Sequence, residues 1–293
     1  MPQNSTFGLS LALAAVLLLS PDTLLMRVSG LDGFEMMAWR GGLVSIVMLS
    51  LWLVTSRDRS GDLAAFASGP GLVATLCQAA NAILFATGIA VAPVAVVLFA
   101  LATVPIWAAI LGALFLGDRI GRATAVTCIA VLAGIGLSVL AGGHGDGGVN
   151  PVLGAFCGLL TAIALAGAFT SYRAAPRLPI MLSLGVGAGL GGTLGLVVSG
   201  GGEADGLALT AIATTGAIIL PAAFFMLGSA SRYTSGANVS LFMLLETVLG
   251  PIIVWIALGE AVPPLSLLGG AIVVVSLALY LSHQRRALRR SSS

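Results

Sequence analysis

The chain has 293 residues, of which 58% are hydrophobic and only 8% are charged, and its mean hydropathy is +1.08. Soluble domains usually contain about 25% charged residues. So few charges cannot cover the surface of a water-soluble fold, so the composition excludes ordinary soluble domains and predicts an integral membrane protein built from α-helices. The net charge of +2 gives no reason to expect nucleic acid as a partner. We expect the lipid bilayer and a small-molecule substrate instead.

The apolar residues are grouped into stretches of membrane-spanning length, since a bilayer core takes about 20 apolar residues per helix. Ten such stretches follow one another, divided by polar residues, glycine or proline. They are residues 9–26, 36–54, 70–89, 93–116, 123–141, 152–172, 180–199, 207–228, 236–258 and 265–282. We expect the first to be a retained helix and not a cleaved signal peptide, because no Lys or Arg precedes it. The sequence therefore predicts an all-α protein with ten transmembrane helices.

The first predicted span contains a proline followed by an acid. Pro21 has no backbone N–H and frees the carbonyl of Leu17, so we expect either a plain kink or a hinge whose broken backbone faces a ligand. Asp22 is one of two acids inside the predicted spans, and acids in a membrane are candidates for proton coupling. The plainer interpretation, which we favour for Asp22, places its carboxylate in the outer water or beside Arg27.

The third span carries a polar stripe. Gln78 and Asn81 are three residues apart and therefore share one face of a helix. Both amides donate and accept hydrogen bonds, which suits a polar or zwitterionic substrate, although hydrogen bonding between helices is the common alternative. Phe85, one further turn along, extends the same stripe and favours a cavity.

The fourth span contains Pro105 in mid-helix, which predicts a bend or gate. Trp107, two residues later, is interpreted either as a cavity wall that stacks on the substrate or as packing against a neighbouring helix.

The seventh span contains a glycine-rich run from Gly185 to Gly195. The run lacks the Lys-Ser/Thr pair and the strand context of a phosphate-binding loop. Small residues at three- and four-residue spacing instead predict that this helix approaches its neighbours closely.

The ninth span contains Glu246, the second acid that lies away from the loops. Phe242 and Met243 precede it by one helical turn and are expected to share its surroundings. One interpretation makes Glu246 a partner for a substrate ammonium group or a proton carrier, and the other makes it a structural glutamate that braces neighbouring helices. Pro251, further along, predicts a bend that serves gating.

The sequence contains no constellation typical of catalysis or of a bound cofactor. Cys77, Cys128 and Cys157 lie far apart in apolar stretches and form no metal or redox motif. His144 and His283 are expected on opposite sides of the membrane, so they cannot form one site. We therefore expect no catalytic residues, no metal and no cofactor, and a protein that is not an enzyme.

The arginines are distributed unevenly between alternate loops. With the N-terminus in the cytoplasm, eleven arginines fall on the inner side and two, Arg27 and Arg40, on the outer side. This positive-inside bias predicts a multi-pass protein of the inner (plasma) membrane with both termini in the cytoplasm. Arg40, at the mouth of the second span, is interpreted either as attracting a carboxylate at the outer mouth or, as we favour, as pairing with Glu35 or a lipid phosphate.

Two segments, 105–118 and 247–260, repeat one pattern, since both end in Leu-Gly followed by an acid. The first motif aligns with the second when the sequence is shifted so that Asp118 matches Glu260. This shift, which we call the repeat offset, is about half the length of the chain. Each half holds five predicted helices, an odd number, so the halves must insert in opposite orientations. Such inverted repeats are common in secondary transporters. We expect a first five-helix repeat at 1–145, a second, inverted one at 146–284, and a basic cytoplasmic tail at 285–293.

This repeated pattern resembles the EamA-type members of the drug/metabolite transporter superfamily over essentially the whole chain. Members commonly read "P…LGE" in helix 4 and "LEP…LGE" in helix 9. Here helix 9 contains Leu245-Glu246-Thr247, and helix 1 has Ser20-Pro21 near its end where many members carry a tryptophan-glycine pair. The resemblance implies a secondary transporter, often an exporter of amino acids or other metabolites, with binding details that differ at these positions.

Together these features predict a carrier that exports small metabolites across the inner membrane by alternating access. The sparse, mixed polar groups favour neutral or zwitterionic amino acids, including aromatic or hydrophobic ones. The first, third, fourth, sixth, eighth and ninth spans are expected to line the cavity. Alternatives are transport of other drug-like or sugar-type metabolites and, in a different class, an intramembrane lipid-modifying enzyme. A monomer is compatible with the sequence, which leaves the oligomeric state and the energy source open.

Overall fold

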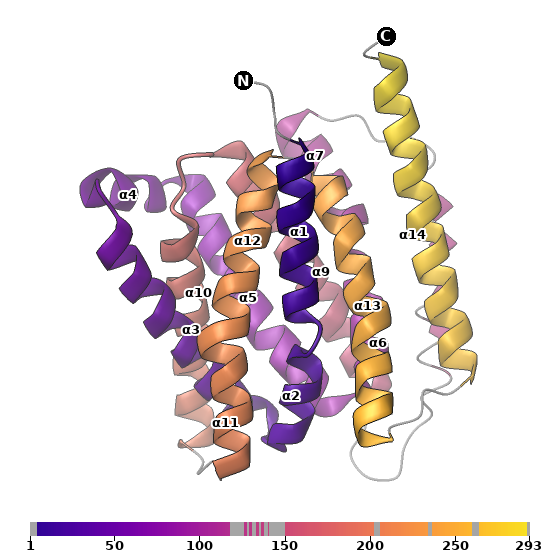
Figure 1. The fold of residues 1–293 in the computed structure, drawn as a ribbon, viewed down its shortest axis with the longest axis horizontal. Coiled ribbons are helices and arrows are strands. Elements are labelled where there is room, and N and C mark those ends of the chain that lie inside the picture. The colour runs from indigo at the N-terminus through magenta and orange to yellow at the C-terminus, as the bar shows by residue number, and fades with distance from the viewer. Residues whose placement is uncertain are drawn as a thin grey trace.

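The computed structural model describes residues 5–117, 126–127, 129–130, 133–134, 136–137, 140, 150–201, 206–233, 236–259 and 264–291. Within these residues every regular element is a helix, and the long helices pack side by side into one bundle (Figure 1). The all-α class expected from the composition is confirmed.

The described helices fall in both halves of the chain. The first half contains α1 (Ser5–Leu19), α2 (Asp22–Ser29), α3 (Gly33–Thr55), α4 (Arg59–Phe66), α5 (Gly69–Val91), α6 (Val94–Leu101) and α7 (Val104–Leu116). The second half contains α9 (Pro151–Ala174), α10 (Ile180–Ser199), α11 (Gly206–Thr214), the π-helical turn η1 (Thr215–Ile219), α12 (Leu220–Tyr233), α13 (Gly236–Leu258) and α14 (Pro264–Ser291). Three spans are each made of more than one element: α1 with α2, α6 with α7, and α11 with η1 and α12.

Seven helical segments in the described part of the chain are long and apolar enough to cross a membrane. They coincide with the predicted spans one to four and six to eight, so a multi-pass membrane protein is confirmed. The helices α13 and α14, of 23 and 28 residues, occupy the predicted ninth and tenth spans. The predicted span 123–141 lies mostly outside the described residues, so the total of ten stays a prediction. The short exposed helix α4 was not predicted, because the hydropathy pattern responds only to long apolar segments.

Two of the three prolines singled out in the sequence lie where a helix is interrupted. Pro21 is the N-cap of α2, directly after α1 ends. Pro105 occupies the first turn of α7, where a missing N–H leaves no helical hydrogen bond unmade. Pro251 lies instead within the continuous helix α13.

The repeat offset relates helices as well as motifs. A shift by the repeat offset aligns the segment formed by α6 and α7 with α13, and both are 23 residues long. Gly117 and Gly259, which follow these helices, have φ angles of 73° and 69°, a left-handed conformation that suits glycine at a helix end. The two segments run through the bundle in opposite directions (Figure 1). This correspondence supports an inverted repeat and explains the two Leu-Gly-acid motifs as equivalent helix ends.

The two ends of the described chain lie at the same end of the bundle. The start of α1, the end of α14 and the helix α4 are found there, whereas α2 and α11 lie at the opposite end (Figure 1). Arg57 and Arg59, at the start of α4, therefore share an end with the C-terminal helix. This arrangement agrees with an arginine-rich inner side, and the assignment of that side to the cytoplasm rests on the positive-inside rule.

The glycines of α10 allow this helix to pack directly on α3 and α5. A Cβ atom at Gly192 would lie 2.6 Å from the backbone nitrogen of Gly42 in α3. A Cβ atom at Gly187 would lie 2.6 Å from the Cβ of Gln78 in α5. Both distances are shorter than van der Waals contact, so the close approach expected from the small-residue spacing is confirmed.

Gly192→Ala is expected to lower the free energy of unfolding by about 1–3 kcal/mol, because the added methyl group overlaps the backbone of α3. The matched control is Gly42→Ala on the facing helix, where an added Cβ meets nothing within 4 Å. Thermal unfolding in detergent micelles measures both variants. Equal melting temperatures for Gly192→Ala and its control would contradict the close packing of α10 on α3.

Candidate functional site

A cavity lies among the helices of both halves. All six spans predicted to line the cavity contribute to its walls, and α3 and α10 also do so. The sequence did not predict α3 and α10 as cavity helices, because most of their lining residues, such as Gly41, Val44 and Ala188, are small or apolar and resemble ordinary packing residues.

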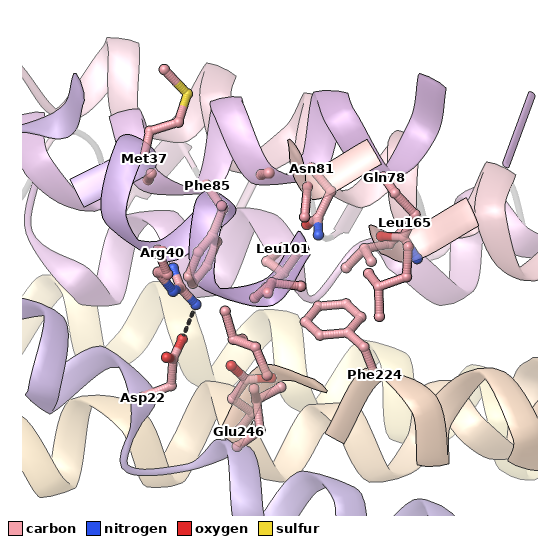
Figure 2. A pocket seen from close by; sticks show the side chains of 18 of the residues that line it. Asp22, Met37, Arg40, Gln78, Asn81, Phe85, Leu101, Leu165, Phe224 and Glu246 are labelled. Atoms are coloured by element: carbon pink, nitrogen blue, oxygen red, sulfur yellow. Dashed lines mark hydrogen bonds and ion pairs between the residues drawn. The ribbon is translucent and has the colours of Figure 1, made fainter. Parts of the chain in front are cut away.

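The cavity wall combines a few polar groups with a large apolar surface. Its polar and charged side chains are Asp22, Arg40, Gln78, Asn81 and Glu246 (Figure 2). Its apolar side chains include Met37, Phe85, Leu101, Leu165, Phe224 and Met243. The structure thus brings together most of the residues singled out in the third and ninth spans. A wall of this kind suits a small molecule with one polar end and one apolar end.

Asp22 and Arg40 form an ion pair inside the bundle. Nη2 of Arg40 donates to Oδ2 of Asp22 (Figure 2). The side chain of Arg40 is 9% exposed and that of Asp22 is 1% exposed. Because two charges buried in apolar surroundings are tolerated only when they are paired, each residue depends on the other for its place in the fold.

This pair corrects the partners that the sequence predicts for both residues. The sequence places Asp22 in the outer water or beside Arg27, and it pairs Arg40 with Glu35 or a lipid phosphate. The chain instead starts a new helix at Asp22, after the interruption at Pro21, and the side chain of this first residue points into the bundle (Figure 2). Glu35 belongs to the capping box of α3, and Nη2 of Arg27 donates to the carbonyl of Ala92 at 2.6 Å.

Two further contacts surround the guanidinium of Arg40. Its Nη1 donates to Sδ of Met26 at 2.8 Å, and sulfur is a weak acceptor. Its central carbon lies 5.5 Å from the centroid of the Phe85 ring, within the range of a cation–π interaction. Phe85 therefore does more than extend the polar stripe of α5, since its ring faces the cation.

Glu246 reaches the same cavity from α13, in the second half of the chain. Its side chain is 3% exposed and interacts electrostatically with both Asp22 and Arg40. Two carboxylates and one guanidinium therefore lie near one another on the cavity wall (Figure 2). Phe242, by contrast, packs against the hydrophobic core and is not among the described residues that line the cavity.

The amide of Gln78 belongs to a hydrogen-bonded chain that the sequence did not reveal. Nε2 of Gln78 donates to the hydroxyl of Tyr172 at 3.2 Å, and this hydroxyl lies 2.9 Å from Oγ of Ser183. Tyr172 stands near a predicted span end, where a membrane-surface position is usual, but it is fully buried between helices. The chain ties α5 to α9 and α10, and it leaves Oε1 of Gln78 without a partner in the described part of the molecule.

Trp107 lies in α7 and packs against the hydrophobic core. It is not among the described residues that line the cavity. Its Nε1 is buried and makes no hydrogen bond to any described residue.

The polar groups of the cavity do not follow the repeat. At the repeat offset, the equivalents of Asp22, Arg40, Gln78 and Asn81 are Ala164, Leu182, Leu220 and Ala223, and the equivalent of Glu246 is Val104. Four of the five polar side chains therefore come from the first half and one from the second. The polar side chains of the cavity wall are therefore not repeated between the two halves of the chain.

In the described part of the chain, no three His, Cys, Asp or Glu side chains are grouped so that they could hold a metal ion. Cys77 and Cys157 are free thiols in this part. Cys128, His144, Asp118 and Glu260 lie outside the described residues.

Residues 6–140 match the EamA-like transporter family. No curated protein matches the chain significantly. Among solved structures, the crystal structure of one protein matches 95% of this chain and 97% of its own, with a TM-score of 0.67 and 18% sequence identity. At this identity the likeness shows a shared fold.

Asp22→Leu is expected to destabilise the protein by about 3–5 kcal/mol, because it leaves the guanidinium of Arg40 buried without its partner. The double variant Asp22→Leu/Arg40→Met removes both charges and is expected to recover most of this loss. Unfolding in detergent micelles measures the two variants and the single variant Arg40→Met. If the double variant were no more stable than Asp22→Leu, the two residues would not be coupled as the structure indicates.

Proposed function

We propose that this chain, whose residues 6–140 match the EamA-like family of multi-pass membrane transporters, exports neutral amino acids with aromatic or aliphatic side chains by alternating access. The cavity is the observation that carries the proposal. A zwitterionic amino acid has one cationic and one anionic group, and the wall offers the carboxylates of Asp22 and Glu246 and the guanidinium of Arg40. Charge-assisted contacts of this kind are stronger than neutral hydrogen bonds.

The apolar wall supports a hydrophobic substrate side chain. Phe85, Leu101, Leu165 and Phe224 line the cavity together with the charged groups. Sugar phosphates and nucleotides carry several negative charges, and in the described wall only Arg40 is cationic. The amide groups of Gln78 and Asn81 suit the remaining hydrogen bonds of a zwitterion.

Alternating access follows from two halves of opposite orientation, at 1–145 and 146–284, that rock around a shared cavity. The interruptions at Pro21 and Pro105 and the bend expected at Pro251 are the hinges of this motion. The arginine distribution supports an inner-membrane location, with the N-terminus and the tail at 285–293 in the cytoplasm. We propose a monomer as the working unit, since one chain supplies the walls of the cavity.

Glu246 is proposed to couple transport to protons. A carboxylate that binds either a substrate ammonium group or a proton makes the two compete, so an amino acid leaves as a proton enters. Asp22, beside it, is a second candidate for the same role.

The carrier hypothesis is tested by counterflow of radiolabelled amino acids in proteoliposomes. Saturable exchange of phenylalanine or leucine is expected for the native protein. Ala188→Phe, which fills the cavity, is expected to reduce exchange at least tenfold, whereas Ala278→Phe on the exposed face of α14 is not. Absence of saturable transport by folded protein across a broad panel of amino acids would contradict the proposal, and transport of sugars or drug-like compounds alone would replace it.

Glu246→Gln is expected to abolish the response of transport to an imposed proton gradient, because an amide cannot take up and release a proton as a carboxylate does. Exchange of phenylalanine at symmetrical pH is expected to persist with weaker affinity. The matched control is Glu35→Gln, since glutamine also serves in the capping box of α3. The same pH profile, gradient response and affinity in Glu246→Gln and the native protein would assign Glu246 to structure alone.

A further inference from the structure

The contact between Asp22 and Arg40 uses only part of what each group offers. A guanidinium has five N–H donors and a carboxylate accepts through two oxygens, so such pairs are often bidentate. Here the ionic contact joins one nitrogen, Nη2, to one oxygen, Oδ2. In the described part of the chain, Nε of Arg40 and Oδ1 of Asp22 are buried and have no hydrogen-bond partner. Buried polar atoms are rarely left this way, so the pair has an open donor and an open acceptor beside the cavity.

The other neighbours of Arg40 do not compete for this open donor. Met26 occupies Nη1 through a weak acceptor, and the Phe85 ring faces the guanidinium carbon. Glu246 on α13 is the remaining charged group on the described wall, and the polar groups that α5 supplies there are the amides of Gln78 and Asn81. The carboxylate of a bound zwitterion therefore has one cation to bind, and Asp22 already holds it.

We propose that Asp22 is an internal stand-in for the carboxylate of the substrate: it pairs with Arg40 in the empty carrier and is displaced when the substrate binds. This inference rests on the proposed function, since it requires a substrate that has a carboxylate. One carboxylate then replaces another on the same guanidinium, and the displaced Asp22 stays beside Glu246, where the ammonium group of the substrate provides a new partner.

The position of Asp22 in the chain suits such a displacement. It is the first residue of α2, directly after the interruption between α1 and α2, so its backbone is not fixed by a continuous helix. Its hydrogen-bond donor, Arg40, lies in a different helix, α3. The contact can therefore break without disturbing either helix.

The stand-in has a consequence for the transport cycle. An empty carrier must return through states in which the cavity is closed and dry, and an unpaired guanidinium is costly there. Asp22 removes that cost in the empty carrier. Exchange of one substrate molecule for another never passes through the empty closed state, so exchange depends on Asp22 less than net efflux does.

Asp22→Asn separates these two processes. In proteoliposomes, the ratio of net efflux to exchange of L-phenylalanine is expected to fall at least tenfold relative to the native protein. The matched control is Asp58→Asn, at the N-cap of α4 outside the cavity, where asparagine is an equally good cap.

Arg40→Lys provides an independent variant that keeps the positive charge beside Asp22 but not the planar set of donors. Its dissociation constant for L-phenylalanine is expected to rise at least tenfold, while that for phenethylamine, which lacks the carboxylate, stays unchanged. A merely structural ion pair predicts equal changes for both compounds.

The outcomes separate the inference from the proposed function. If the native protein transports phenylalanine but net efflux and exchange change equally in Asp22→Asn, the stand-in role is wrong and the carrier stands. If Asp22→Asn does not fold, equal changes for the two compounds in Arg40→Lys overturn the inference. If the native protein transports no amino acid, the proposed function fails and the inference fails with it.

Discussion

Charges inside a membrane protein have to be neutralised where they lie, and the pairing of Asp22 with Arg40 is the interaction on which this cavity depends. The two residues come from different spans, and their meeting requires two features of the backbone. The interruption at Pro21 starts a new helix with Asp22 directed inward, and the glycine contact between α3 and α10 holds the helix that carries Arg40 tightly in the bundle. The polar site is thus a product of helix packing and not of any local motif.

The repeat and the site obey different constraints. The repeat offset matches the α6–α7 segment to α13 with the same length and the same left-handed glycine at the end, so the two halves share this part of the scaffold. The polar groups of the wall have only apolar equivalents across the repeat. A scaffold with two equivalent halves suits two alternative access states, whereas a single asymmetric set of charges suits one substrate molecule held in one orientation.

Sequence patterns predicted the spans well because hydropathy over about 20 residues is a strong signal. They predicted Glu246, Gln78 and Asn81 as inward-facing because polar side chains in a span rarely face lipid. They missed the Asp22–Arg40 pair because Arg40 stands near a predicted span end, where an arginine ordinarily serves an interface role. The buried hydroxyl of Tyr172 was missed for the same reason. Which polar residues meet across helices depends on helix rotation and on breaks such as that at Pro21, and neither can be read from composition.

The central claim is that Arg40 receives the carboxylate of a bound amino acid in place of Asp22. An experimental structure of the protein in lipid nanodiscs with bound L-phenylalanine tests this claim most directly. The account predicts the carboxylate of the ligand on the guanidinium of Arg40, the Asp22 carboxylate moved away from it, and the ammonium group beside Glu246. A ligand whose carboxylate lies elsewhere, with the Asp22–Arg40 pair intact, would contradict it.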